Sequence, residues 1–544
     1  MSIASDSADR SAEKAAAGRF GRRSFLRSVV AGGTALAAGG ILDSLSPASS
    51  QAATSGSSVT SAPRRGGNLR VGLTGGGSSD TLIPFDGGIS AIGTARAQQL
   101  YQPLVQLGND AQLQYVLAEE IVPKGTTSKW IIRCRKGVTF HNGKPFGADD
   151  VIYTLRTILN QKLGGALVLA PVDTKGLRKV DDLTVEVPTT SPFGSFPEQL
   201  AAFWYFLYIA PDGWTQKDRP NGTGPFRYHS FTPGEESVFV RNDNYWKPGR
   251  PYLDSVTIQD YQDPTSVQNA LISKAIDCTG QLSGVQELTL KHTAGVVTVP
   301  SRTGAIQPFT MRVDRPPFND VNVRQAFRYL VNRPELIDAS LDGFGWVAAD
   351  VTSPYDPDFD HSLHREQDLP QARYLLKKAG YDNDLKVPLY SSLAVSASAL
   401  SMATVLAQQA SSVGVTVNII QASATTFFSN DYTKVAFSQI YYDYSPYLAQ
   451  VAQTFLPTSP FPETHFNDPH YTSLYYEANK TQKASVRKEI EYEMQRIDFT
   501  QGGYIIPCFV DSLDAYSSNL VGYQTGKVGE PLGNFNFEDY WFRS

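Results

Sequence analysis

The sequence contains little cysteine, and its cysteines are widely spaced. Cys134, Cys278 and Cys508 are the three among 544 residues, and they form neither a CxxC pair nor another metal-ligand spacing. The pattern therefore indicates no cysteine-bound metal. Spacing alone leaves open one disulfide with one free thiol and does not choose the pair, but three buried, inert thiols are the favoured interpretation.

Charged residues are also scarce. Asp, Glu, Lys and Arg make up 19% of the chain, with a formal net charge of −5, whereas about 25% charged residues is usual. No basic stripe follows the first 53 residues, so we expect no nucleic-acid partner. Aromatic residues reach 11%, including 27 tyrosines. This combination suits a protein with a large internal cleft, although a β-rich globular protein would share it.

Motifs that carry catalysis are missing as well. The chain has no GxSxG, no HExxH and no spaced cluster of His, Cys and Asp. We therefore expect no enzyme, no cofactor and no metal. A scattered catalytic triad leaves no sequence signature, so an exported hydrolase remains an alternative, and an exported ligand sensor is another.

The first 53 residues predict an export signal. Arg22 and Arg23 lie in the segment GRRSFLR, an Ala/Gly-rich apolar run covers residues 29–42, and small residues occupy 47–53. This order resembles a twin-arginine signal peptide, which implies export by the twin-arginine machinery to the periplasm or the outer face of the membrane. The apolar run is too short for a convincing membrane span. No cysteine lies near the cleavage region, so we expect no lipid anchor, and residues 54–67 predict a flexible linker.

Residues 221–246, NGTGPFRYHSFTPGEESVFVRNDNYW, predict a β-hairpin around which the chain is organised. Gly222 and Gly224 suit a turn because glycine adopts positive φ readily. A strand begins at Phe226, a second turn follows at residues 233–234, and residues 237–241 form the returning strand.

Three further segments accompany this hairpin in a fixed order. They are KGVTFHNGKPFGADDV at 136–151, PFNDVNVRQAF at 317–327 and QIYYDYSPY at 439–447. The four segments together resemble the family 5 extracytoplasmic solute-binding proteins, the peptide- and nickel-binding components of ABC importers. The resemblance extends from Asn68 to about the C-terminus.

The resemblance implies an α/β, two-lobed, periplasmic-binding-protein-like fold of type II with an additional inserted domain. The implied first lobe comprises 68–100, 221–307 and 501–544, the inserted middle domain 101–220, and the second lobe 308–500. Periodicity independently predicts helices at residues 263–275, 370–380, 395–413 and 477–500. The apolar run at 203–209 favours a buried strand, with a cleft lining as the alternative.

The resemblance also implies a function. We expect a monomeric protein that captures a small solute between its lobes and delivers it to ABC permease subunits in the membrane. Short peptides are the expected ligand, and a nickel chelate or an oligosaccharide is the alternative.

Asp443 is the leading ligand-binding candidate. It occupies the family's aromatic-x-Asp-Tyr-x-Pro position, where the resemblance implies a carboxylate for a peptide α-ammonium. Tyr441, Tyr442 and Tyr444 flank it and offer hydroxyls or ring faces. Ser78, in a Gly-rich loop, and Trp204, in the aromatic run, complete the predicted ligand-binding set.

Two patterns resemble metal sites without completing them. Asp356, Asp358 and Asp360 alternate as at the start of a calcium loop, but the sixth position is His361 and the twelfth is Gln367, which excludes an EF-hand. His361 and His364 have i, i+3 spacing, and we expect them in a solvated loop. His141 has no neighbouring ligand residue, so we expect a structural role for it.

Overall fold

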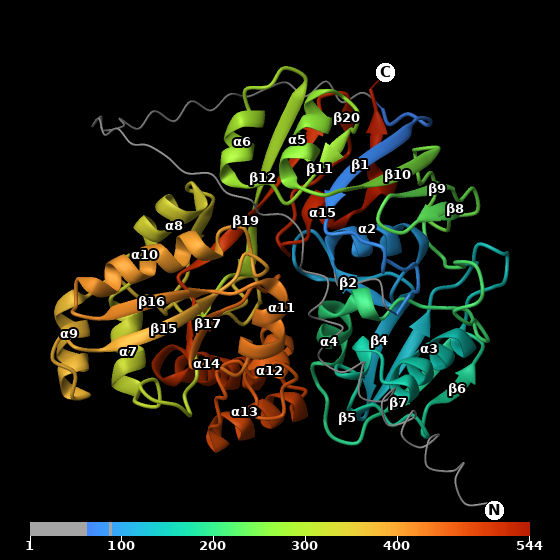
Figure 1. The fold of residues 1–544 in the computed structure, drawn as a ribbon. Helices are drawn as coiled ribbons and strands as arrows, with labels where there is room; N and C mark the ends of the chain where they lie inside the picture. Colours follow the sequence, from blue (N-terminus) through green and yellow to red (C-terminus); the bar gives the residue numbers. More distant parts are fainter. Residues whose placement is uncertain (1–61, 86–89, 544) are drawn as a thin grey trace, which may run out of the picture.

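The computed structural model describes residues 62–85 and 90–543, which fold around three larger β-sheets (Figure 1). The eight-stranded sheet has the order β12-β19-β11-β1-β10-β9-β8, with β14 paired to β19. Its strands are β1 (Asn68–Thr74), β8 (Phe226–Thr232), β9 (Glu236–Arg241), β10 (Ser255–Tyr261), β11 (Cys278–Thr279), β12 (Val296–Ile306), β14 (Gly345–Val347) and β19 (Cys508–Ser517). Helices α2 (Ala91–Leu100), α5 (Pro264–Ile272), α6 (Gly284–Leu290) and α15 (Pro531–Asn534) accompany it.

The five-stranded sheet has the order β16-β15-β17-β13-β18. Its strands are β13 (Phe309–Met311), β15 (Lys386–Ser391), β16 (Thr416–Gln421), β17 (Phe437–Gln439) and β18 (Tyr504–Ile505). The surrounding helices are α7 (Val321–Tyr329), α8 (Arg333–Leu341), α9 (Leu369–Lys378), α10 (Ala399–Ser411), α12 (Tyr447–Thr454), α13 (Pro469–Lys480) and α14 (Ala484–Gln501). Parallel pairing of β15 with β16, connected through α10, gives this part its α/β character.

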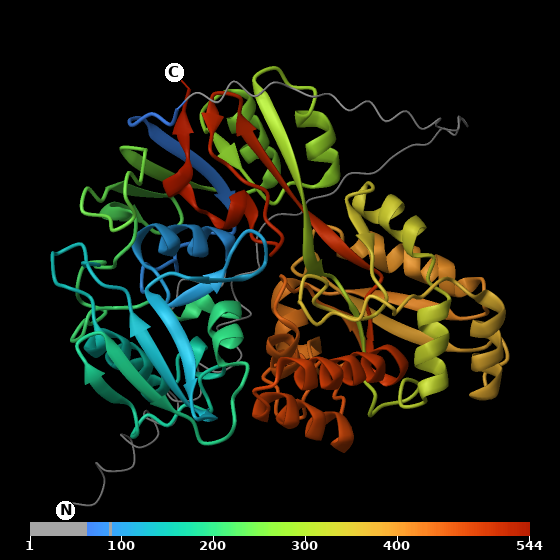
Figure 2. The same ribbon diagram turned by 180° about the vertical axis from the view of Figure 1, so that it is seen from behind.

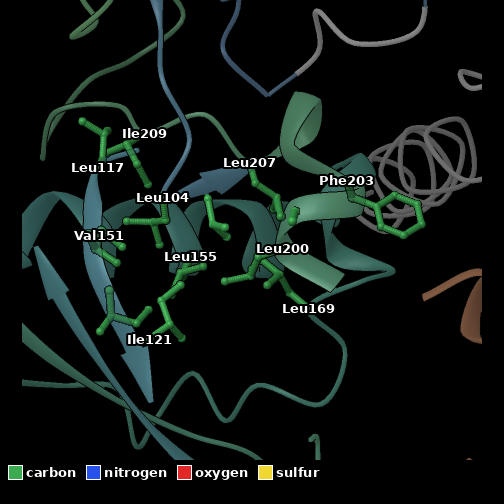
Figure 3. Packing of buried hydrophobic residues seen from close by; sticks show 14 of the residues in the cluster. Leu104, Leu117, Ile121, Val151, Leu155, Leu169, Leu200, Phe203, Leu207 and Ile209 are labelled. Carbon is green, nitrogen blue, oxygen red and sulfur yellow. The ribbon is translucent and has the colours of Figure 1, made fainter. Parts of the chain in front are cut away.

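The four-stranded sheet has the order β4-β5-β7-β6 and is antiparallel throughout. Its strands are β4 (Ala118–Lys124), β5 (Thr126–Cys134), β6 (Arg178–Asp181) and β7 (Thr184–Pro188), and it packs with α3 (Ala148–Gln161) and α4 (Phe196–Ala202). Figure 3 shows the core of this part, where Val151 and Leu155 of α3 point toward Ile121 of β4 and toward Leu117, which directly precedes β4. The i, i+4 spacing on α3 supplies the apolar face that this packing needs.

Strands β12 and β19 connect the eight-stranded and five-stranded parts (Figure 2). They pair antiparallel from Val296–Ser517 to Ile306–Phe509, with an irregularity between Ser301 and Ala305. β13 follows directly after β12, and β18 directly precedes β19, so the chain passes between the two parts along both strands.

The hairpin predicted at residues 221–246 is present as β8 and β9, with Gly234 at positive φ in the turn. Gly222 and Gly224 are required for a different reason from the predicted one. An added Cβ would lie 2.0 Å from the Leu100 carbonyl oxygen at Gly222 and 2.3 Å from the Gln99 carbonyl oxygen at Gly224. The two glycines therefore let the turn approach the end of α2 closely.

Two predicted elements are wrong. The run at 203–209 is not a strand: α4 ends at Ala202, and a 3₁₀ turn covers Trp204–Phe206. The helix predicted at 477–500 is two helices, α13 and α14, because the backbone is extended at Thr481 and Lys483. Gln482 lies in this break, and its side-chain amide donates to the Gly125 carbonyl at 2.8 Å.

The three cysteines are free and buried, as the sequence analysis favoured. Burial raises the pKa of the Cys134 and Cys508 thiols to about 12. Because the reactive form of cysteine is the thiolate, these side chains are inert packing groups.

Candidate functional site

The segment 439–447 runs from the five-stranded sheet to the chain near the C-terminus. β17 ends at Gln439, Tyr442 exchanges two backbone hydrogen bonds with Ile306 at the end of β12, and the Tyr444 amide donates to the Val528 carbonyl at 2.7 Å. Extended backbone sends alternate side chains to opposite sides. Tyr441 and Asp443 therefore share one side, and Tyr442 and Tyr444 share the other.

Asp443 is half-buried against Tyr441 and Gly529. The Tyr441 hydroxyl donates to Asp443 Oδ1 at 3.2 Å. Gly529, at φ 124°, lies so close that an added Cβ would be 2.4 Å from Oδ1. Burial raises the pKa of Asp443 to about 6, and the Tyr441 hydrogen bond opposes this shift. The contact with Gly529 thus brings the carboxylate against the C-terminal segment.

Glu530 is a second half-buried carboxylate beside Asp443. Its pKa lies well above the ordinary value because it is buried and because the charge of Asp443 opposes its ionisation. Among residues 62–85 and 90–543, no Lys or Arg forms an ion pair with either carboxylate. Two like charges so placed favour retention of a proton unless a cation is bound between them.

Tyr205 brings the third part of the molecule to these carboxylates. It lies in the 3₁₀ turn Trp204–Phe206, beyond the four-stranded sheet, and is half-buried. Its pKa is raised by burial and then by the charges of Asp443 and Glu530. Tyr208 responds to Glu530 in the same way, and its hydroxyl donates to Gln98 Oε1 at 3.2 Å. We name the group Asp443, Glu530, Tyr441 and Tyr205 the carboxylate cleft, after the ligand cleft between the lobes that the sequence analysis expects.

The other predicted ligand residues lie elsewhere. The Tyr442 hydroxyl contacts the buried carboxylate of Glu463, which also accepts from Tyr432 and, at 2.5 Å, from Tyr504. Trp204 is buried in the core beside Tyr208, with ring centroids 5.7 Å apart. Ser78 is exposed next to the turn at Gly234.

Tyr444 lines a separate cavity of about 600 Å³ between the four-stranded and five-stranded parts. Trp130 and Glu198 line one side of this cavity, and Asp356 and Arg487 line the other. The Tyr444 ring meets the Tyr355 ring edge-on, with the two centroids 5.9 Å apart. Tyr444 thus lines this cavity from the side of the segment opposite to Asp443, which is not among the lining residues.

The histidines singled out by the sequence are structural or solvated. His141 Nε2 lies 3.0 Å from the Gly224 carbonyl, and its Nδ1 accepts from the Gly222 amide at 3.4 Å. These bonds need a neutral ring, and burial lowers the pKa of His141 to about 4. His361 and His364 are exposed in the loop that precedes α9.

Sequence reasoning missed Glu530 and Tyr205. The aromatic run at 203–209 contains Tyr205, but the sequence analysis predicts Trp204 as its ligand-binding residue. No local pattern marks Glu530, because only the chain path brings it to Asp443.

The family described as bacterial extracellular solute-binding proteins, family 5 Middle, matches residues 112–467. The chain belongs to this family. It is therefore a substrate-binding protein of an ABC importer and not an enzyme, as the sequence analysis expected.

Among relatives of this family 5 protein, the glutathione-binding protein GsiB of Pectobacterium atrosepticum is 29% identical over 357 residues, which is 64% of this chain and 68% of GsiB. GsiB of Escherichia coli K12 is 25% identical over 85% of this chain and 93% of GsiB. The substrate-binding protein CtaP of Listeria monocytogenes has a similar structure, with a TM-score of 0.77 at 21% identity. The match covers 88% of this chain and 100% of CtaP. The structures confirm the predicted periplasmic-binding-protein fold.

The expected location is confirmed in part. The family is extracellular or periplasmic. No helix among the described residues is both long and apolar enough to cross a bilayer. The twin-arginine segment and its cleavage region lie outside the described residues.

Proposed function

We propose that this protein binds short peptides, and that the carboxylate cleft holds their α-ammonium group. The observation that carries the proposal is the pair Asp443 and Glu530, two half-buried carboxylates near which the described chain places no ion-paired cation. An ammonium group removed from water needs opposite charge and hydrogen-bond acceptors. The pair offers both, so a cationic ligand group fits it better than a neutral or anionic one.

The tyrosines give the cleft its selectivity. Tyr441 donates to Asp443 and leaves the other carboxylate oxygen, Oδ2, for a ligand. Tyr205 lies near enough for the charges of both carboxylates to raise its pKa, and it adds a ring and a hydroxyl to the group. The relative GsiB is named for glutathione, a peptide with a free α-ammonium group, and this supports the same ligand class.

The division into lobes adds to this proposal. Asp443 comes from the proposed second lobe, Glu530 from the C-terminal segment of the first, and Tyr205 from the proposed inserted domain. A ligand held by all three would keep the parts together, as in closure of two lobes about a hinge. The solute would then be presented to the permease in the closed form.

The test is calorimetry with Asp443→Asn, which keeps the shape and removes the charge. Loss of one partner of a buried charge pair typically costs about 2–5 kcal/mol, equivalent to about 30- to several-thousand-fold weaker binding. We expect that loss for a peptide with a free amino end and a much smaller loss for the same peptide N-acetylated. Tyr442→Phe is the matched control, since Tyr442 contacts Glu463 and not Asp443.

Two results would contradict the proposal. A folded Asp443→Asn protein that binds free peptide as tightly as the parent would place the anchor elsewhere. Binding of a nickel chelate or an oligosaccharide, with no binding of peptides, would retain the transport role and replace the ligand class.

A further inference from the structure

The alternating acidic residues of the loop before α9 meet a third carboxylate that the sequence does not reveal. One carboxylate oxygen from each of Asp356, Asp358 and Glu491 lies within 4.8 Å of the others. Glu491 comes from α14, far along the chain from the loop. The loop lacks the twelfth-position acid of a calcium-binding loop, and α14 supplies an acid in its place.

Helix α14 fixes the loop in this position through Gln495. Its side-chain amide donates to the Asp358 carbonyl at 2.8 Å, and its oxygen accepts from the Asp360 amide at 2.8 Å. Gln495 and Glu491 are four residues apart in one helix and so share a face. The bonds made by Gln495 therefore bring the Asp358 side of the loop to Glu491.

Glu491 has one carboxylate oxygen that is paired and one that is not. Its side chain is 1% exposed, and Oε1 accepts from Arg487 Nε at 2.7 Å. Its second oxygen, Oε2, is buried, and no group in the described part of the chain forms a hydrogen bond with it. A buried carboxylate oxygen without a partner is costly, and a cation satisfies it.

The surrounding charge is unbalanced toward the negative. Arg487 is shared between Glu491 and Glu198, whose Oε1 lies 2.8 Å from it, and Lys488 Nζ is 3.9 Å from Asp358. These two cations and Lys483, which also lines the cavity, face four carboxylates, counting Asp356.

We propose that Asp356, Asp358 and Glu491 form a calcium site at the edge of the cavity between the four-stranded and five-stranded parts. Carboxylate oxygens select hard cations, and calcium accepts irregular sets of oxygen ligands and completes them with water. Asp356, Asp358 and Glu198 line the cavity of about 600 Å³, which leaves room for such waters. This inference does not depend on which solute the carboxylate cleft binds.

The site would stabilise the neighbouring cleft segment. Asp356 Oδ2 accepts from the Tyr447 amide at 2.8 Å, at the first turn of α12, and α12 begins just after Asp443. Arg487 connects Glu491 to Glu198 of α4, in the four-stranded part. A bound cation would therefore hold the loop, α12 and α14 together where two parts of the molecule meet.

The experiment is calcium binding to the full chain after treatment with a chelator. Equilibrium dialysis should show one calcium per chain, with an affinity of about 0.1–1 mM as in other extracellular sites. Calcium chloride should raise the thermal unfolding midpoint saturably, whereas potassium chloride of equal ionic strength should not. Tighter binding of magnesium than of calcium would overturn the assignment of the cation.

Two variants locate the site. Asp358→Asn and Glu491→Gln should each weaken calcium binding at least tenfold while the far-UV circular dichroism stays unchanged. Glu366→Gln is the matched control, because Glu366 is an exposed acid in the same loop outside the cluster, and its affinity should stay within twofold of the parent. Absence of saturable binding in the parent, or equal binding in parent and Asp358→Asn, would overturn the proposal; the parent measurement holds even if a variant fails to fold.

Discussion

At the scale of single residues, the carboxylate cleft depends on two acids that cannot both ionise cheaply. Burial disfavours their charged forms, and Asp443 further opposes the ionisation of Glu530. A ligand cation favours both charged forms, so its binding must displace protons. An ammonium group of the proposed ligand would therefore lower the free-energy cost of ionising both acids.

This competition predicts a pH dependence of peptide affinity. Because the pKa of Asp443 without ligand is raised to about 6, affinity should fall as pH decreases through that value, by up to about tenfold per pH unit for one competing proton. Calorimetry of a free-amino peptide across this range measures the effect, with Tyr441, Tyr205 and Glu530 as the titratable neighbours.

Asp443→Asn provides the control for this pH profile, since it has no carboxylate to protonate at that position. Its weaker affinity should change much less through the same range. If the parent protein binds the peptide with the same affinity at about pH 5 and pH 7, ligand binding does not displace a proton from Asp443.

At the scale of elements, the turn at residues 221–225 brings two segments of the family pattern together with the end of α2. Gly222 and Gly224 rest on the end of α2, and His141 bonds to both glycines. His141 itself lies in the segment 136–151, directly before α3. The turn is therefore a fixed junction between the large sheet and the four-stranded part.

Gly224→Ala should lower the free energy of unfolding. Its Cβ would lie 2.3 Å from the Gln99 carbonyl oxygen, a backbone atom that cannot rotate away, and overpacking of this kind costs about 1–3 kcal/mol. Gly77→Ala is the matched control, because nothing lies within 4 Å of its added Cβ. Equal denaturation midpoints for the two variants would show that the turn has room to shift.

Element prediction succeeded where local signals agree with tertiary packing. The β8–β9 hairpin has turn residues at both ends and alternating strands, and α9 has an apolar face and a glycine after its end. It failed at 203–209, where β-like composition forms α4 and a 3₁₀ turn against the core. It also failed to divide α13 from α14, because the break is favoured by contacts such as Gln482 with Gly125 and not by a local breaker.

Of the four residues of the candidate site, only the two that are neighbours in the sequence could be predicted. Asp443 and Tyr441 lie in a recognisable segment and alternate onto one side. Glu530 belongs to the C-terminal segment and Tyr205 to the 3₁₀ turn after α4, and only the packing of these parts against each other brings them near Asp443. The same limit explains Glu491, which joins the loop at Asp356 through the packing of α14.

At the scale of the whole molecule, the four-stranded and five-stranded parts meet through polar bonds and through apolar residues such as Ala449, which is buried in the core of the four-stranded part. Asn479 at the end of α13 accepts from the Ser195 amide and hydroxyl, at 2.9 and 2.7 Å, and its carbonyl accepts from the Gly194 amide at 2.8 Å. Gln199 donates to the Leu448 carbonyl at 3.3 Å. The described structure is thus closed across the four-stranded and five-stranded parts, with β12 and β19 as the proposed hinge.

Small-angle X-ray scattering should detect opening about this hinge. Without ligand, the parts that meet at Asn479 should separate for much of the time, and a bound peptide should reduce the radius of gyration by joining Asp443, Glu530 and Tyr205.

Asn479→Ala removes the side-chain bonds to Ser195, and a lost buried hydrogen bond costs about 1–3 kcal/mol. Because only the closed form loses these bonds, the variant should bind peptide about 5- to 150-fold more weakly, yet reach the parent's compact profile at saturation. Tyr476→Phe, a change at an exposed residue of the same helix, should match the parent in both measurements. Identical scattering profiles with and without saturating peptide would mean that the parts form one rigid body, and Asn479→Ala would then lose affinity only if it deformed the site itself.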